Sequence, residues 1–153
     1  MHVGITALAL SLFRHYAGTD LARIGRIAGP KHSEETMNTV VKLGDSASME
    51  PITADLDGWT VVEGTPSMKT WVLHTSEDGS MISGYWEATP GTYHATYTEY
   101  EFVHMMQGKL TITPDGGTPV VLGPGDAFVV EAGFKGLWKI EETIRKHFAI
   151  KLK

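Results

Sequence analysis

Short apolar stretches alternate with turn residues along the chain from Lys69 onward. The stretches are rich in β-branched and aromatic residues and recur roughly every ten residues, with glycine, proline or aspartate turns between them. In one stretch, Leu110 and Ile112 alternate with threonines, the period of two expected of a strand with one buried face. A series of short strands without a long helical pattern predicts an all-β sandwich or barrel. The expected strands cover 69–75, 81–89, 92–98, 100–106, 110–114, 119–122, 127–131, 137–140 and 147–152.

The segment before these strands is less regular. Residues 37–67 are rich in Asp, Gly, Pro and Ser, with short apolar pieces at 39–43 and 59–62. We interpret the segment as an N-terminal arm that adds one or more edge strands to a barrel formed by 68–153, because such arms cover exposed sheet edges.

Residues 1–36 differ from the rest of the chain in charge. They hold four Lys or Arg against three Asp or Glu, which gives them a net charge of +1. Because the whole chain has a net charge of −5, the remaining residues have a net charge of −6. Their apolar start has no basic segment before it and no clear cleavage site after it, unlike a secretory signal. We therefore expect an N-terminal extension outside the domain; translation from Met37 is the alternative.

Composition excludes several kinds of chemistry. The 153 residues contain no cysteine, so disulfides, zinc–thiolate sites and cysteine nucleophiles are excluded. A net charge of −5 argues against nucleic acid as a partner, because nucleic-acid binders present basic faces. No apolar run reaches the ~18 residues that a membrane-spanning helix needs, so we expect no membrane partner. These features, without a convincing signal sequence, favour a cytoplasmic protein.

Two spaced motifs point to a known fold. Six residues separate Glu101 and Gly108 in EFVHMMQG, and PGDAFVVEAG contains the spacing Gly125-x5-Glu131-x-Gly133. With the turn between them, these segments resemble the two motifs of the cupins. Over 68–153, and more loosely over the arm, the chain is similar to small single-domain cupins related to (S)-ureidoglycine aminohydrolase and to an ethanolamine-utilisation cupin. The resemblance implies a double-stranded β-helix, or jelly-roll barrel, and a homodimer.

The same resemblance raises the question of a metal. Metal-binding cupins take two histidines and a glutamate from the first motif and a histidine from the second. With the shorter family spacing the first pair falls on Ala95 and Tyr97; with the longer one it contains His94 and a threonine. At the position of the second-motif histidine this chain has Gly136. Catalytic metals take three or more protein ligands, so we expect no complete metal site and no cofactor, while a loosely held divalent ion is left open.

Three polar residues alternate at the start of the first motif. Tyr97, Glu99 and Glu101 would share one face of an extended strand. If that face lines the barrel, two neighbouring carboxylates raise the pKa of one of them, which supplies an acid and a base near neutrality. We take these three as candidate catalytic residues. The alternative places Glu99 in a solvated turn.

Other side chains are candidates for contacts with a ligand. Trp86, Phe128 and Trp138 would wall a barrel cavity, although aromatic residues on strands also form ordinary core. Lys135 precedes a glycine at the expected barrel mouth and would receive a carboxylate or phosphate; otherwise it is an exposed turn lysine. His94 is the remaining candidate.

These features suggest a protein that binds or converts a small polar metabolite in the barrel. Ureido or amide compounds, amino-acid derivatives and sugar acids fit the expected acidic, tyrosine-bearing pocket. Acid–base chemistry needs positioned groups of matched pKa more than it needs a metal. The alternatives are a metabolite-binding or sensing module without turnover, and a dimeric interaction module. The sequence leaves the choice between enzyme and binding protein open.

Overall fold

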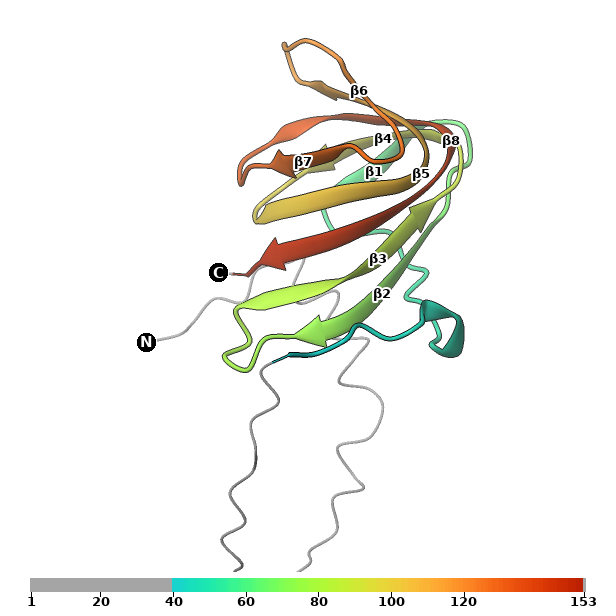
Figure 1. Ribbon diagram of the computed structural model, residues 1–153. Coiled ribbons are helices and arrows are strands. Elements are labelled where there is room, and N and C mark those ends of the chain that lie inside the picture. The colour runs from blue at the N-terminus through green and yellow to red at the C-terminus, as the bar shows by residue number, and fades with distance from the viewer. Residues whose placement is uncertain (1–39, 153) are drawn as a thin grey trace, which may run out of the picture.

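The computed structural model describes residues 40–152, which form a curled antiparallel sheet (Figure 1). The strands are β1 (Trp59–Glu63), β2 (Met68–Thr75), β3 (Met81–Ala88), β4 (Gly91–Thr96), β5 (Tyr100–Pro114), β6 (Val120–Leu122), β7 (Ala127–Val130) and β8 (Lys135–Lys151). Within residues 40–152 the only helical element is a 3-10 turn, Ser46–Ser48. The all-β prediction is therefore confirmed, and this part of the chain has no helix long and apolar enough to cross a membrane.

The two longest strands hold the two walls of the barrel together. β5 and β8 run antiparallel along most of their lengths. β8 pairs with β4 through its first half and with β3 through its second half, while β5 pairs with β7 and then with β6. Both long strands therefore belong to both walls, and Figure 1 shows the sheet folding over on itself along them.

Two pairs of predicted strands are single strands in the structure. The merged segments are 100–106 with 110–114, in β5, and 137–140 with 147–152, in β8. Gly108 has a φ of 85° and lies within a run of register shifts between β5 and β8. A bulge of this kind bends a strand without ending it. What reads as a turn in the sequence is thus the bend that carries β5 from one wall to the other.

The described part of the predicted arm lies along both edges of the sheet. β1 pairs only with β4, and Ile52 exchanges two backbone hydrogen bonds of 2.9 Å with Thr70 of β2. The arm therefore contributes an edge strand at one side and a single bridge at the other. The predicted extension over 1–36 lies outside the described residues.

Aromatic side chains fill the space between the walls. Trp59 of β1 lies at the centre of this group, with its ring 5.1 Å from that of Trp138 and 5.6 Å from that of Trp86. Tyr93 and Tyr97 pack against the same indole at 5.7 and 5.8 Å. Each such ring buries roughly 200 Å² of surface, about 5 kcal/mol of transfer free energy, so this cluster is a main source of stability.

Candidate functional site

A charged cluster lies inside the aromatic core. The Nζ of Lys146 donates a 2.7 Å hydrogen bond to Oε1 of Glu101, and the hydroxyl of Tyr97 donates one of 2.8 Å to Oε2. Lys146 is 2% exposed, Glu101 4% and Tyr97 5%. Ions removed from water in this way cost several kcal/mol each unless they are paired, and here each oxygen of the carboxylate has a donor.

Three different elements position the cluster. Glu101 and Lys146 occupy inward positions of the paired strands β5 and β8, where the residues next to them along each strand point outward. Tyr97 follows β4 and is fixed by its backbone: its N–H donates to the carbonyl of Phe134 at 2.8 Å, and its carbonyl accepts from the N–H of Gly133 at 2.8 Å. The turn of the second motif therefore sets the place of the phenol.

The surroundings of the cluster change its proton affinities. Burial lowers the pKa of Lys146, and the attraction of Glu101, which raises it, offsets only part of that effect. Burial, followed by the charge and hydrogen bond of Glu101, raises the pKa of Tyr97 well above 10. Tyr97 therefore stays a phenol and donor at neutral pH. The ammonium lies 4.7 Å from the ring centroids of both Trp86 and Trp138, distances at which indole faces attract cations.

A small cavity adjoins the charged pair. It has a volume of about 20 Å³, enough for one water molecule. The hydroxyl of Thr70 and the indole N–H of Trp86, both of residues that line the cavity, have no hydrogen-bond partner among the described residues. A buried donor without a partner costs about 1–3 kcal/mol, so the cavity is suited to a bound water.

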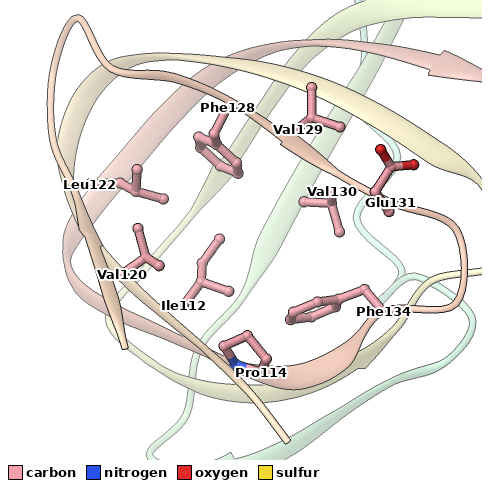
Figure 2. A pocket seen from close by; sticks show the side chains of 9 residues that line it. All are labelled: Ile112, Pro114, Val120, Leu122, Phe128, Val129, Val130, Glu131 and Phe134. Carbon is pink, nitrogen blue, oxygen red and sulfur yellow. The ribbon is translucent and has the colours of Figure 1, made fainter. Parts of the chain in front are cut away.

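A larger pocket opens at the mouth of the barrel. Its volume is about 380 Å³, in the size range of small-ligand sites (Figure 2). The side chains around it come from β5, β6, β7 and the turn that follows β7: Ile112, Pro114, Val120, Leu122, Phe128, Val129, Val130, Glu131 and Phe134. Eight of the nine are apolar, and Glu131 is the one charged residue among them.

One layer of aromatic side chains separates this pocket from the charged cluster. The ring of Phe134 lies 5.7 Å from that of Tyr97, and the ring of Phe128 lies 6.1 Å from that of Trp138. Tyr97 and Trp138 in turn contact Glu101 and Lys146. The site therefore has an apolar outer chamber and a charged inner end.

The predicted alternation of burial is present at the start of the first motif, although residues 97–99 form a bend between β4 and β5 and not an extended strand. Tyr97, Glu99 and Glu101 are all buried, whereas Thr98 and Tyr100 between them are exposed. The alternative that placed Glu99 in a solvated turn is wrong, because its side chain is 1% exposed and accepts a hydrogen bond from Thr98. Of the three residues, Tyr97 and Glu101 are joined directly.

The structure places the aromatic ligand-binding candidates at the site and the two polar candidates away from it. Phe128 lines the mouth pocket, and Trp86 and Trp138 flank the ammonium. His94 does not reach the pocket, because its neighbours on β4 take the inward positions and its own ring pairs with Asp115 at 3.0 Å. Lys135 is exposed at the start of β8 and lines neither cavity.

Lys146 is the site residue that the sequence analysis missed. On β8 the side chains of Ile144, Lys146, Phe148 and Ile150 all point inward, at every second position. This period of two was the available signal, since an inward lysine must find a buried partner.

The residues present do not fit the metal site of the family. Ala95 and Gly136, at two of the ligand positions, are paired across β4 and β8 and have no donor atoms in their side chains. Glu101 is already bound to an ammonium, whose charge would repel a metal ion. In the described part of the chain, no three His, Asp or Glu side chains are grouped closely enough to hold an ion.

Comparisons with known proteins agree with the barrel. Residues 75–148 match the family model of the EutQ-like cupin domain, and no curated protein matches the chain. EutQ from Clostridium difficile is 21% identical, with a TM-score of 0.52 over 57% of this chain and 70% of its own. A DUF861-family protein from Pseudomonas syringae is 16% identical, with a TM-score of 0.56 over 68% of this chain and 45% of its own.

A third similar structure is the polyketide cyclase RemF from Streptomyces resistomycificus. It is 15% identical, with a TM-score of 0.54 over 73% of this chain and 80% of its own. At these identities the likeness concerns the fold alone. The nearer resemblance to (S)-ureidoglycine aminohydrolase stays a prediction. The barrel and the match over residues 75–148 show that this part of the chain has the fold of a small cupin and resembles the EutQ-like cupin domain.

Proposed function

We propose that this protein binds a small molecule in the mouth pocket, with an apolar body against the walls and a polar group directed at the inner cluster. The observation that carries the proposal is the pairing of a 380 Å³ apolar chamber with a buried Tyr97–Glu101–Lys146 network behind it. Ligand sites commonly combine apolar walls with a few convergent polar groups.

The lining narrows the ligands expected from the sequence. A sugar acid would give up its hydration to eight apolar side chains without gaining hydrogen bonds, which costs free energy for every buried hydroxyl. An amide, ureido or amino-acid derivative with an apolar substituent meets the same walls favourably. We therefore place such compounds ahead of sugar acids.

A thermal-shift screen of the full chain tests this proposal. The panel contains amides, ureido compounds, acids and sugars, each with and without manganese, nickel and zinc. Stabilisation by an apolar-substituted compound without metal supports the proposal, because a ligand that binds only the folded state raises Tm. Stabilisation by metal alone, or by no compound, contradicts it.

A matched pair of variants locates the binding site. Val120→Lys puts a charge on the pocket wall at a side chain that is 51% exposed, so folding should tolerate it. Val62→Lys makes the same change on β1, at 55% exposure, away from the pocket. We expect the first variant to weaken ligand binding by about tenfold or more and the second to leave it unchanged. Equal affinities for the two variants would place the ligand elsewhere.

Self-association is a second candidate function. Phe102 of β5 and Val129 of β7 are paired across the sheet, and each is 43% exposed; Val129 also borders the mouth pocket. Tyr100, two residues before Phe102, is 36% exposed on the same face. An apolar patch of this kind on the outer face favours contact with a second copy of the chain, as the cupin resemblance implies.

A further inference from the structure

We propose that Lys146 forms an imine with the carbonyl group of an aldehyde or ketone, with Glu101 as the proton carrier. The proposal rests on the proposed function in one step, because the pocket at the mouth must deliver the carbonyl compound. It adds both a reaction and a substrate class to that function.

The position of the lysine is the first argument. A structural ion pair is seldom worth its desolvation in a core that apolar residues could fill, so a buried pair of this kind calls for a functional explanation. Burial lowers the pKa of Lys146, which favours the neutral amine, the form that acts as a nucleophile. Lysines held in apolar pockets in this way form imines in other enzymes.

The partners of the lysine supply the proton transfers. In the part of the chain that is described, the ammonium donates one hydrogen bond, to Oε1 of Glu101 at 2.7 Å. The other carboxylate oxygen is held by Tyr97 at 2.8 Å, which fixes the direction of the acid and makes Tyr97 a positioning residue. The indoles of Trp86 and Trp138 flank the nitrogen, with each ring centroid 4.7 Å from it.

The reaction balances with these groups alone. Lys146 first passes one proton to Glu101, which leaves a neutral amine and a carboxylic acid. The amine attacks the carbonyl carbon, and a proton moves from nitrogen to oxygen to give a carbinolamine. Glu101 then protonates the hydroxyl, water leaves, and a protonated imine remains. Its positive charge faces the regenerated carboxylate as the ammonium did.

The mouth pocket gives the carbonyl compound its route. Phe128 and Phe134 line the pocket, and behind them lie Trp138 and Tyr97, which contact the lysine and its carboxylate. The rings of Tyr97 and Trp138 form the single layer between chamber and amine, and they must move apart for the carbonyl carbon to reach the nitrogen. The apolar walls select carbonyl compounds with an apolar substituent.

Benzoylacetone is a suitable probe, because a neutral lysine converts it, with loss of water, to a stable enaminone that absorbs in the near ultraviolet. The full chain is incubated with the probe and digested, and each lysine is assigned by peptide mass spectrometry. We expect Lys146 to be modified at least about tenfold faster than the exposed Lys69 and Lys139. Modification of exposed lysines only, or at equal rates, overturns the proposal.

Two variants distinguish loss of the reactive lysine from loss of folding. Lys146→Met alone leaves Glu101 buried and unpaired, so the double variant with Glu101→Gln, which removes both charges, is used as the folded control. It should lose the fast adduct and keep its circular dichroism. Glu101→Gln alone keeps the amine but leaves Lys146 without its counter-ion, so its circular dichroism is first compared with that of the wild type. In the folded variant the adduct should form about tenfold or more slowly, since proton transfer is lost. An unchanged rate would remove Glu101 from the reaction.

The diol obtained by reducing both carbonyl groups of benzoylacetone distinguishes the two proposals. It has the same apolar body and no carbonyl group. If it raises Tm and Val120→Lys abolishes that shift, the pocket binds ligands; absence of a Lys146 adduct then overturns the imine alone. If neither compound raises Tm and Val120→Lys leaves the adduct rate unchanged, the pocket proposal fails instead.

Discussion

The side chain with the largest influence on the site is a lysine in a place where lysines are rarely found. Lys146 lies among indoles and aliphatic side chains, and its charge is balanced by one carboxylate. Within a buried pair the loss of one partner is more damaging than the loss of both, because the remaining charge has neither water nor a counter-ion.

This asymmetry gives a prediction for stability. Lys146→Ala should lower the free energy of unfolding by about 3–5 kcal/mol, whereas Lys146→Met combined with Glu101→Gln should change it by less than about 1 kcal/mol. Urea unfolding of the full chain followed by tryptophan fluorescence measures both. If the two variants lose equal stability, the pair is not held as tightly as its 2.7 Å hydrogen bond indicates.

A second prediction concerns alkaline pH. Burial, with the nearby carboxylate of Asp55, raises the pKa of Tyr93 to about 12 from 10.0. Between those pH values the unfolded chain releases the phenol proton and the folded protein keeps it, so stability contributed by Tyr93 falls as pH rises through this window. Tyr93→Phe should flatten the decline in Tm, measured calorimetrically from pH 10 to 12. A decline as steep as in the wild type would count against the shifted pKa.

At the scale of elements, the bend in β5 decides the shape of the site. Gly108, with its φ of 85°, lies where a Cβ atom would meet the carbonyl oxygen of Thr143 at 2.2 Å. The glycine of the first motif is therefore required for two reasons, its backbone conformation and the close approach of β8.

Two alanine variants separate these reasons. Gly116 also has a positive φ, of 70°, but a Cβ there has nothing within 4 Å. Gly116→Ala should cost about 1 kcal/mol from the backbone alone, and Gly108→Ala roughly 3 kcal/mol or more because β8 must also move. Denaturant unfolding gives both values, and equal losses would show that the contact with β8 relaxes freely.

The strands could be found from the sequence because a strand with one buried face repeats every two residues. Tyr97, Glu99 and Glu101 are buried as predicted, but Tyr97 and Glu99 lie in the bend between β4 and β5, where the period of a strand does not by itself set the burial. The merging of strands could not be found, because a glycine at a bulge and a glycine in a turn look alike without the partner strand. Lys146 was missed for a related reason: its partner Glu101 lies 45 positions earlier, and only the paired strands bring them together.

At the scale of the whole molecule, the outer face of β5 and β7 is open to a partner. If two copies pair through this face, Phe102→Lys should shift the mass measured by light scattering from dimer to monomer, because the charge would be buried in the contact. Leu137→Lys, at 38% exposure on β8, is the control and should leave the mass unchanged. A monomeric wild type rules out this candidate.

The long pairing of β5 with β8 has a consequence for how the molecule comes apart. Both strands belong to both walls of the barrel, so we expect that one wall cannot unfold while the other stays folded. The ammonium and its carboxylate lie on those two strands, so exposing them to bulk water through the backbone requires the long β5–β8 pairing to open. The connectivity of the strands thus protects the charged pair from bulk water, in addition to the rings that surround it.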